Sequence, residues 1–162
     1  MNTGEIILVI GALILFSVTA IFLNQAILDG DRTVTESRLT NGATAVALSY
    51  IENAKRLSFD EAVIADPDLN NPGMLTLPAN LGPESGESPA DFDDIDDFRQ
   101  YTDSVKTNIV TYNVAITVAY IDTNTMSVSE HNQTYYKQMR VFVHTPFIPD
   151  TIKLAHIFTF WE

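Results

Sequence analysis

Residues 5–23 read EIILVIGALILFSVTAIFL, one carboxylate followed by an unbroken apolar run. Within the run the only polar side chains are Ser17 and Thr19, whose hydroxyls can bond back to a carbonyl of the same helix. The apolar part, residues 6–23, rises by about 1.5 Å per residue in a helix and would span roughly 27 Å, close to one hydrocarbon core. The stretch therefore predicts a helix of membrane-crossing length.

The flanks of this helix do not fit an ordinary membrane signal. A secretory signal peptide begins with basic residues and ends in a small-residue cleavage site, whereas the first basic residue here is Arg32 and the run ends in FLN at 22–24. A simple anchor carries positive charge on its cytoplasmic side, where this chain has Glu5. We therefore expect that a short basic leader is removed before Met1, and that the new amine, on the same chain or a neighbour, meets the Glu5 carboxylate.

Residues 1–23, MNTGEIILVIGALILFSVTAIFL, resemble the mature N-terminus of type IV pilins and of type II secretion pseudopilins. The resemblance implies that a prepilin peptidase cuts before Met1 and methylates its amine. It also implies that Glu5 pairs with the Met1 amine of an adjacent subunit as the helices bundle into a filament. The implied partners are further copies of this chain, the inner-membrane assembly machinery and, before assembly, the membrane. Phe22 stands where many pilins have a kinking proline, and there is no cysteine for their C-terminal disulfide loop.

Residues 24–57 predict an amphipathic helix that continues the apolar one. Glycine costs about 1 kcal/mol against alanine inside a helix, so continuity is weakest at Asp29-Gly30-Asp31. Two interpretations stay open there: a tolerated glycine or kink, and a locally unwound, extensible stretch. The apolar positions recur at three- and four-residue steps: Leu39, Ala43, Val46, Ala47, Tyr50, Ile51, Ala54 and Leu57.

Residues 58–107 are predicted to be a loop region. Ser58 and Glu61 match a capping box, which predicts a short helical turn over 59–64. Prolines and glycines then punctuate residues 66–90 and exclude long regular elements. We expect this segment to drape over the surface of the head.

The most distinctive short motif is FDDIDDF at residues 92–98. The three-residue spacing of Phe92, Ile95 and Phe98 predicts one helical turn with its apolar side chains inward and its aspartates in water. The alternative interpretation is a calcium site formed by Asp93, Asp94, Asp96 and Asp97, because oxygen-rich clusters suit hard cations. The motif lacks the glycine and the closing glutamate of an EF-hand. It is, however, similar to a loop of minor-pseudopilin-type proteins, and some pseudopilins bind calcium.

Residues 108–162 predict an antiparallel sheet. Residues 108–122 alternate between bulky and small side chains, and the pattern does not decide which face packs on the alanine-rich helix. Residues 134–145 and 151–161 predict two more strands, and short polar connections favour an antiparallel meander.

The expected fold class is α+β, with a long N-terminal α-helix packed on a small antiparallel β-sheet, as in pilins. We divide the chain into an apolar helix, residues 1–23, and a pilin-like head, residues 24–162.

Several function classes are disfavoured by composition and motifs. The net charge is −12 and the 9 basic residues are scattered, so a nucleic-acid partner is not expected. The histidines His131, His144 and His156 lack metal-ligand spacing, and there is no thiol nucleophile, P-loop or GxSxG motif. We therefore predict no enzyme activity, and no cofactor other than calcium. The triplet NQT at Asn132 matches a glycosylation sequon.

The sequence thus predicts a structural subunit that polymerises through its N-terminal helix into an extracellular type IV pilus-like filament for adhesion, motility or secretion. In the filament core Glu5 would be tolerated only when paired with a Met1 amine, because a buried unpaired charge costs several kcal/mol. We expect the protein in the membrane before assembly and at the cell surface afterwards. The alternative is a membrane-anchored minor pseudopilin or a single-pass tethered binding module.

Overall fold

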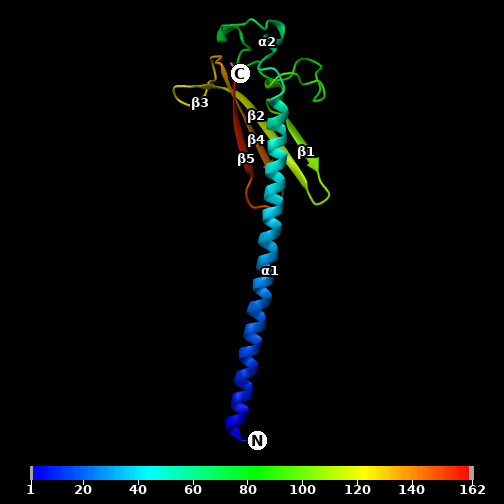
Figure 1. The fold of residues 1–162 in the computed structure, drawn as a ribbon, viewed down its shortest axis with the longest axis vertical. Helices are drawn as coiled ribbons and strands as arrows, with labels where there is room; N and C mark the ends of the chain where they lie inside the picture. Colours follow the sequence, from blue (N-terminus) through cyan, green and yellow to red (C-terminus); the bar gives the residue numbers. More distant parts are fainter. Residues whose placement is uncertain (1, 161–162) are drawn as a thin grey trace. The chain divides into compact units, whose positions relative to one another are not determined.

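The computed structural model describes residues 2–160, and the chain forms two compact units, residues 1–39 and 40–162 (Figure 1). Helix α1, Thr3–Ala54, includes residues of both units and is unbroken at Gly30. The predicted continuation of the apolar helix into the amphipathic one is therefore confirmed. Each unit is described separately below.

The N-terminal unit consists of the first part of α1. The helix begins where the Glu5 amide donates to the Asn2 carbonyl at 2.9 Å. The hydroxyls of Ser17 and Thr19 donate to carbonyls four residues earlier, at 2.8 and 2.7 Å, as the sequence predicts. Both polar side chains of the apolar run are thus satisfied by their own helix.

The C-terminal unit contains one antiparallel sheet in the order β1-β2-β4-β5, with β3 paired to β2. The predicted α+β class is confirmed. The three predicted strands are present as β2, β4 and β5, whereas β1 and β3 were not predicted, and β1 lies inside the segment expected to be loop. The strands are β1 (Thr102–Lys106), β2 (Thr111–Asp122), β3 (Ser127–Val128), β4 (Tyr136–His144) and β5 (Ile152–Thr159).

The core of this unit lies between the sheet and the last turns of α1, which cross it in Figure 1. Alternate side chains of β2 are buried, and they are the bulky ones, from Tyr112 to Tyr120. A Cβ built on Gly42 would lie 2.3 Å from the Tyr112 hydroxyl oxygen, so helix and strand are in close contact there. The bulky face of β2 therefore packs on the alanine-rich face of α1, which includes Ala43 and Ala47.

Residues 58–107 contain three short helical elements besides β1: α2 (Glu61–Ala65), η1 (Pro72–Met74) and η2 (Asp96–Phe98). The cap of α2 is Asp60, whose carboxylate accepts from the Ala62 amide, so the predicted capping role of Ser58 is wrong. The backbone of Ser58 instead pairs with the acidic turn. Its amide donates to the Asp93 carbonyl at 2.9 Å, and its carbonyl accepts from the Ile95 amide at 3.0 Å.

Candidate functional site

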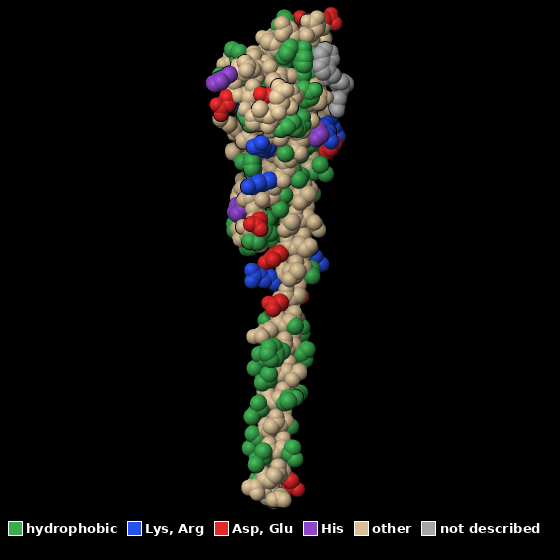
Figure 2. Space-filling model, turned by 90° about the vertical axis from the view of Figure 1, so that its left-hand side faces the viewer, with side chains coloured by type: hydrophobic (Ala, Val, Ile, Leu, Met, Phe, Trp, Pro, Cys, Tyr) green, Lys and Arg blue, Asp and Glu red, His purple; other side chains and the backbone are tan. Residues whose placement is uncertain are grey.

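The first candidate site is the apolar surface of α1. Every described residue from Asn2 to Thr35 is exposed, with Leu8 at 75% and Phe16 at 73%. An 18-residue window of the helix has a mean hydropathy of 3.0 with none of it buried, so by length and composition the helix can cross a membrane. Figure 2 shows hydrophobic side chains along this part of the chain. An apolar surface of this extent indicates a lipid or protein neighbour.

Glu5 is the only charged residue among the described residues that precede Asp29. Its Oε2 accepts a hydrogen bond from the Asn2 amide at 3.2 Å. Since the Glu5 amide also donates to the Asn2 carbonyl, the side chain closes the first helical turn as in a capping box. Met1 lies outside the described residues, so the pairing of Glu5 with a Met1 amine stays a prediction.

The second candidate site is the acidic turn around η2, where the expectation of solvated aspartates is wrong for three of the four residues. Asp94, Asp96 and Asp97 are each only 1% exposed, whereas Asp93 is exposed as expected. The predicted inward orientation is confirmed for Ile95 and Phe98, which are buried, whereas Phe92 is half-buried. Hydropathy did not predict this burial, because the carboxylates are hydrogen-bonded to groups inside the protein.

Asp94 and Asp97 bind backbone amides of their own turn. Asp94 Oδ1 accepts from the amides of Asp96 and Asp97 at 2.7 and 3.2 Å, and Asp97 Oδ2 accepts from those of Asp93 and Asp94, both at 3.1 Å. Their second oxygens, Asp94 Oδ2 and Asp97 Oδ1, are buried without a hydrogen-bond partner among the described residues. Burial raises the pKa of Asp94 to about 9, with Asp96 adding to the shift, and raises the pKa of Asp97 to about 6. Asp94 therefore carries a proton at neutral pH.

Lys137 on β4 connects this turn to the core. Its Nζ is fully buried, donates to the Phe59 carbonyl and to Asp60 Oδ2, both at 2.7 Å, and contacts Asp96 Oδ1. The rings of Phe59 and Tyr120 lie beside it, with centroids at 4.8 and 5.2 Å. One cation and two carboxylates are thus enclosed in a space shared with aromatic rings.

Asp60 is held by several further donors. Its Oδ1 accepts from the Ala62 amide, the Thr76 amide and the Thr76 hydroxyl at 3.1, 3.0 and 2.8 Å, and its Oδ2 accepts from the Tyr120 hydroxyl at 2.7 Å. Burial alone would raise the pKa of Asp60, but the Lys137 charge and these hydrogen bonds hold the pKa below its usual value. Asp60 is therefore a stable buried anion.

This buried cluster, defined as Lys137, Asp60, Asp96, Asp94 and Tyr120, was not predicted from the sequence. One signal was present. Lys137 lies in phase with the buried Met139, Val141 and Val143 of the same strand, where alternation predicts an inward side chain.

A group of three carboxylates that could hold a cation lies nearby. Oxygens of Glu84, Glu87 and Asp97 are within 4.8 Å of one another. Burial, with a hydrogen bond to Glu87 as the next cause, raises the pKa of Glu84 to about 7. Of the four aspartates in the predicted calcium set, only Asp97 belongs to this group, and calcium binding stays a prediction.

The remaining sequence candidates lie outside the clusters described above. Asn132 is exposed in the connection between β3 and β4, where its carbonyl accepts from the Ser129 hydroxyl at 2.7 Å, and its glycosylation stays a prediction. His131 is in the same connection, whereas His144 and His156 lie on β4 and β5.

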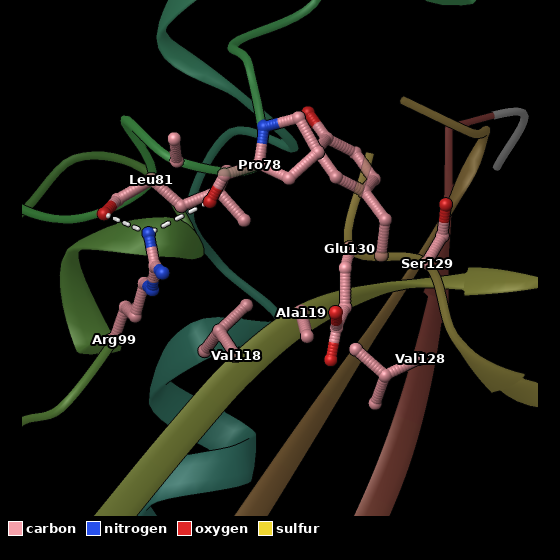
Figure 3. Close-up of a pocket in the computed structure, with 10 residues that line it drawn as sticks. Pro78, Leu81, Arg99, Val118, Ala119, Val128, Ser129 and Glu130 are labelled. Atoms are coloured by element: carbon pink, nitrogen blue, oxygen red, sulfur yellow. Dashed lines mark hydrogen bonds between the residues drawn. The ribbon is translucent and has the colours of Figure 1, made fainter. Parts of the chain in front are cut away.

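A cavity of about 360 Å³ lies between the loop at Pro78–Leu81 and strands β2 and β3 (Figure 3). The Arg99 guanidinium on its wall donates from Nη1 to the carbonyls of Pro78 and Leu81 at 2.8 and 2.9 Å. Arg99 therefore holds this loop through a single guanidinium nitrogen. Glu130 and Val128 lie on the other side of the cavity in Figure 3, and Val118 lies between them and Arg99 in this view.

Comparisons of the chain with protein-family models, with curated proteins and with solved structures found no match.

Proposed function

We propose that this protein is a structural subunit that polymerises through its N-terminal helix into a type IV pilus-like filament at the cell surface. The observation that carries the proposal is the exposed apolar surface of α1 with a single charged residue, Glu5, at its N-terminal end. A lipid anchor needs apolar side chains only, and a carboxylate at its rim adds cost. In a bundle of identical helices, a neighbouring chain can supply a cation that pairs with this carboxylate.

Assembly then exchanges lipid contacts for contacts between helices. Side-chain packing and closely approaching backbones drive helix association in an apolar medium. Gly4 and Gly11 have no other atom within 4 Å of the position a Cβ would occupy, so both leave room for a neighbouring helix. In the proposed mechanism the subunit waits in the membrane and enters the filament when its Glu5 carboxylate meets a Met1 amine.

The experiment is electron microscopy of filaments sheared from the native cells, with mass spectrometry of their main protein and of its N-terminal residue. We expect this chain to dominate the filaments, with an N-terminal amine at Met1, methylated or free. Recovery of the chain only as an unassembled membrane protein would contradict the proposal.

A substitution pair separates the role of Glu5 from that of charge in general. Glu5→Gln should reduce filament yield while leaving the amount of membrane-inserted protein unchanged. Asp31→Asn, which removes an exposed carboxylate from the same helix, is the matched control and should assemble normally. Abundant normal filaments from Glu5→Gln would show that assembly does not require the Glu5 carboxylate to pair with a Met1 amine.

The alternative is a membrane-anchored minor pseudopilin or a tethered binding module, and the cavity beside Arg99 is the observation in its favour. In that case the chain would stay in the membrane fraction, and loss of Glu5 would have no effect on its function. Adhesion, motility and secretion are all roles that the proposed filament could serve.

A further inference from the structure

The primary amine of Lys137 lies in the core of the C-terminal unit, in contact with a carboxyl group with which it can condense. We propose that Lys137 Nζ and the Asp96 side chain form an intramolecular amide bond that joins strand β4 to η2. The proposal concerns the C-terminal unit alone and does not depend on the proposed filament.

The geometry places the two reacting groups together. Lys137 Nζ contacts Asp96 Oδ1, and both side chains are almost completely excluded from solvent, with exposed fractions of 0% and 1%. Reacting groups that are held in contact behave as if present at very high concentration, which for well-oriented pairs reaches effective molarities of about 10⁵–10⁸ M. The surroundings also exclude the bulk water that would favour hydrolysis.

Two carboxylates contact Lys137, and their surroundings assign different roles to them. Asp60 receives four hydrogen bonds besides that of Lys137, from Ala62, Thr76 and Tyr120, and these stabilise its anionic form. A carboxylate held in this way is a poor electrophile. Asp60 is therefore the group that orients the amine, and Asp96 is the group that is attacked.

Asp94 provides the polarising group for Asp96. Burial is the main cause that raises the pKa of Asp94, and the neighbouring Asp96 carboxyl raises it further. Asp94 Oδ1 is fixed by two backbone amides, and Asp94 Oδ2 is buried without a hydrogen-bond partner among the described residues. A carboxylic acid that donates a hydrogen bond to the Asp96 carbonyl would stabilise the negative charge that develops on this oxygen during attack.

The step balances without any other reactant. The Lys137 ammonium passes a proton to the Asp96 carboxylate, the neutral amine attacks Asp96 Cγ, and a C–N bond forms as a C–O bond breaks. A second proton from the nitrogen leaves with the departing hydroxyl, so the products are one amide and one water molecule.

The reaction also removes an electrostatic cost. The cluster encloses the carboxyl groups of Asp60 and Asp96 with the Lys137 amine, and a buried ion pair pays a desolvation penalty that its mutual attraction often fails to recover. Amide formation replaces one such pair by a neutral group. Asp60, the remaining anion, keeps the hydrogen bonds from Ala62, Thr76 and Tyr120.

The test is a tryptic digest of the full chain, purified in detergent under denaturing conditions and analysed by mass spectrometry. Trypsin cuts after the basic residues, so Asp96 falls in peptide 57–99 and Lys137 ends peptide 107–137. We expect a single branched species in which peptide 57–99 is joined to peptide 107–140. Its mass should be that of both peptides less one water, with no cleavage after Lys137.

Recovery of peptides 57–99 and 107–137 as separate, unmodified species would overturn the proposal. Because Asp60 lies in the same peptide as Asp96, fragmentation of the branched species must place the bond, and a bond at Asp60 would also contradict the assignment. The peptide masses and the fragmentation are measured on the unaltered protein, so the test does not depend on whether a variant folds.

Two variants add a matched comparison. Lys137→Arg keeps the positive charge but removes the reactive amine, and should give peptide 57–99 in its unmodified form. Asp97→Asn changes a carboxylate of the same turn that does not contact Lys137, and should retain the branched species. Loss of the branched species in Asp97→Asn, with the circular dichroism of the unaltered protein, would contradict the roles assigned within the turn.

Discussion

Lys137 Nζ lies 2.7 Å from Asp60 Oδ2, and both side chains are completely buried although the two residues are 77 positions apart in the chain. Asp60 also caps α2 through the Ala62 amide and holds the backbone and hydroxyl of Thr76. A single carboxylate thus connects a helix, a loop and a central strand. The consequences for stability can be measured.

Asp60→Ala should lower the free energy of unfolding by about 3–5 kcal/mol, because it removes a helix cap and leaves the buried Lys137 nitrogen, the Thr76 donors and the Tyr120 hydroxyl without this acceptor. Chemical denaturation followed by circular dichroism would measure the loss. Asp66→Ala is the control, since Asp66 is exposed and, among the described residues, its carboxylate accepts only from the Asp68 amide in its own turn. Equal losses from both substitutions would show that the buried contacts of Asp60 contribute nothing measurable to stability.

Gly42→Ala and Gly30→Ala should change stability in opposite directions. A Cβ at Gly42 would lie 2.3 Å from the Tyr112 hydroxyl oxygen, and such overpacking costs about 1–3 kcal/mol. At Gly30 no atom lies within 4 Å of the Cβ position, so the substitution should stabilise the helix by up to about 1 kcal/mol.

Denaturation of each glycine variant beside the unaltered protein measures both effects. In a Tyr112→Phe background the cost of Gly42→Ala should shrink, since the closest atom is gone. A stabilising Gly42→Ala would mean that the helix and β2 can separate without cost. A destabilising Gly30→Ala would favour the locally unwound interpretation of that stretch.

Asp94 should make the protein less stable as the pH rises. Its pKa is raised from the ordinary value of 3.8 to about 9, so between these values the folded state keeps a proton that the unfolded state has lost. Stability falls with pH wherever the folded state binds more protons, so this contribution decreases from about pH 4 to about pH 9. Asp94→Asn should flatten that part of the profile of Tm against pH, and an unchanged slope would contradict the assignment.

Tyr50→Phe should raise the pKa of Asp103. The Tyr50 hydroxyl donates to Asp103 Oδ2 at 2.5 Å, and this hydrogen bond is the main cause that lowers the pKa of the carboxyl. Titration of the Asp103 carboxyl by NMR would follow the shift towards the usual value. Tyr101→Phe is the comparison, because Tyr101 contributes the smaller effect. A larger shift from Tyr101→Phe would reverse the ranking of the two tyrosines.

The parts of the fold with a strong local period were predictable from the sequence. The apolar run and the helical recurrence of Leu39, Ala43 and Ala47 predict α1, and the alternation of residues 108–122 predicts β2. In each case the apolar side chains recur with the period of the helix or the strand. Residues that are close in the sequence are therefore enough to identify the element. The alternation could not choose the packed face of β2, because the answer depends on how bulky side chains such as Tyr112 meet the helix.

The parts that depend on distant residues were not predictable. Strand β1 is almost entirely exposed and has no apolar alternation, so only its pairing with β2 defines it. The burial of Asp94 and Asp96 depends on backbone amides and on Lys137, which hydropathy does not describe. The alternation of β4 predicts that the Lys137 side chain points inward. It does not predict which residues Lys137 contacts, because these lie far away in the sequence.

The order of the sheet leaves β1 and β5 as its edges, with a row of backbone groups on each that could pair with another strand. Charged side chains project from both edges, exposed at Asp103 and Lys106 on β1 and at Lys153 on β5. Charges at such positions discourage the addition of a foreign strand. In the proposed filament, the C-terminal units of many copies would therefore lie close together without their sheets merging into an aggregate.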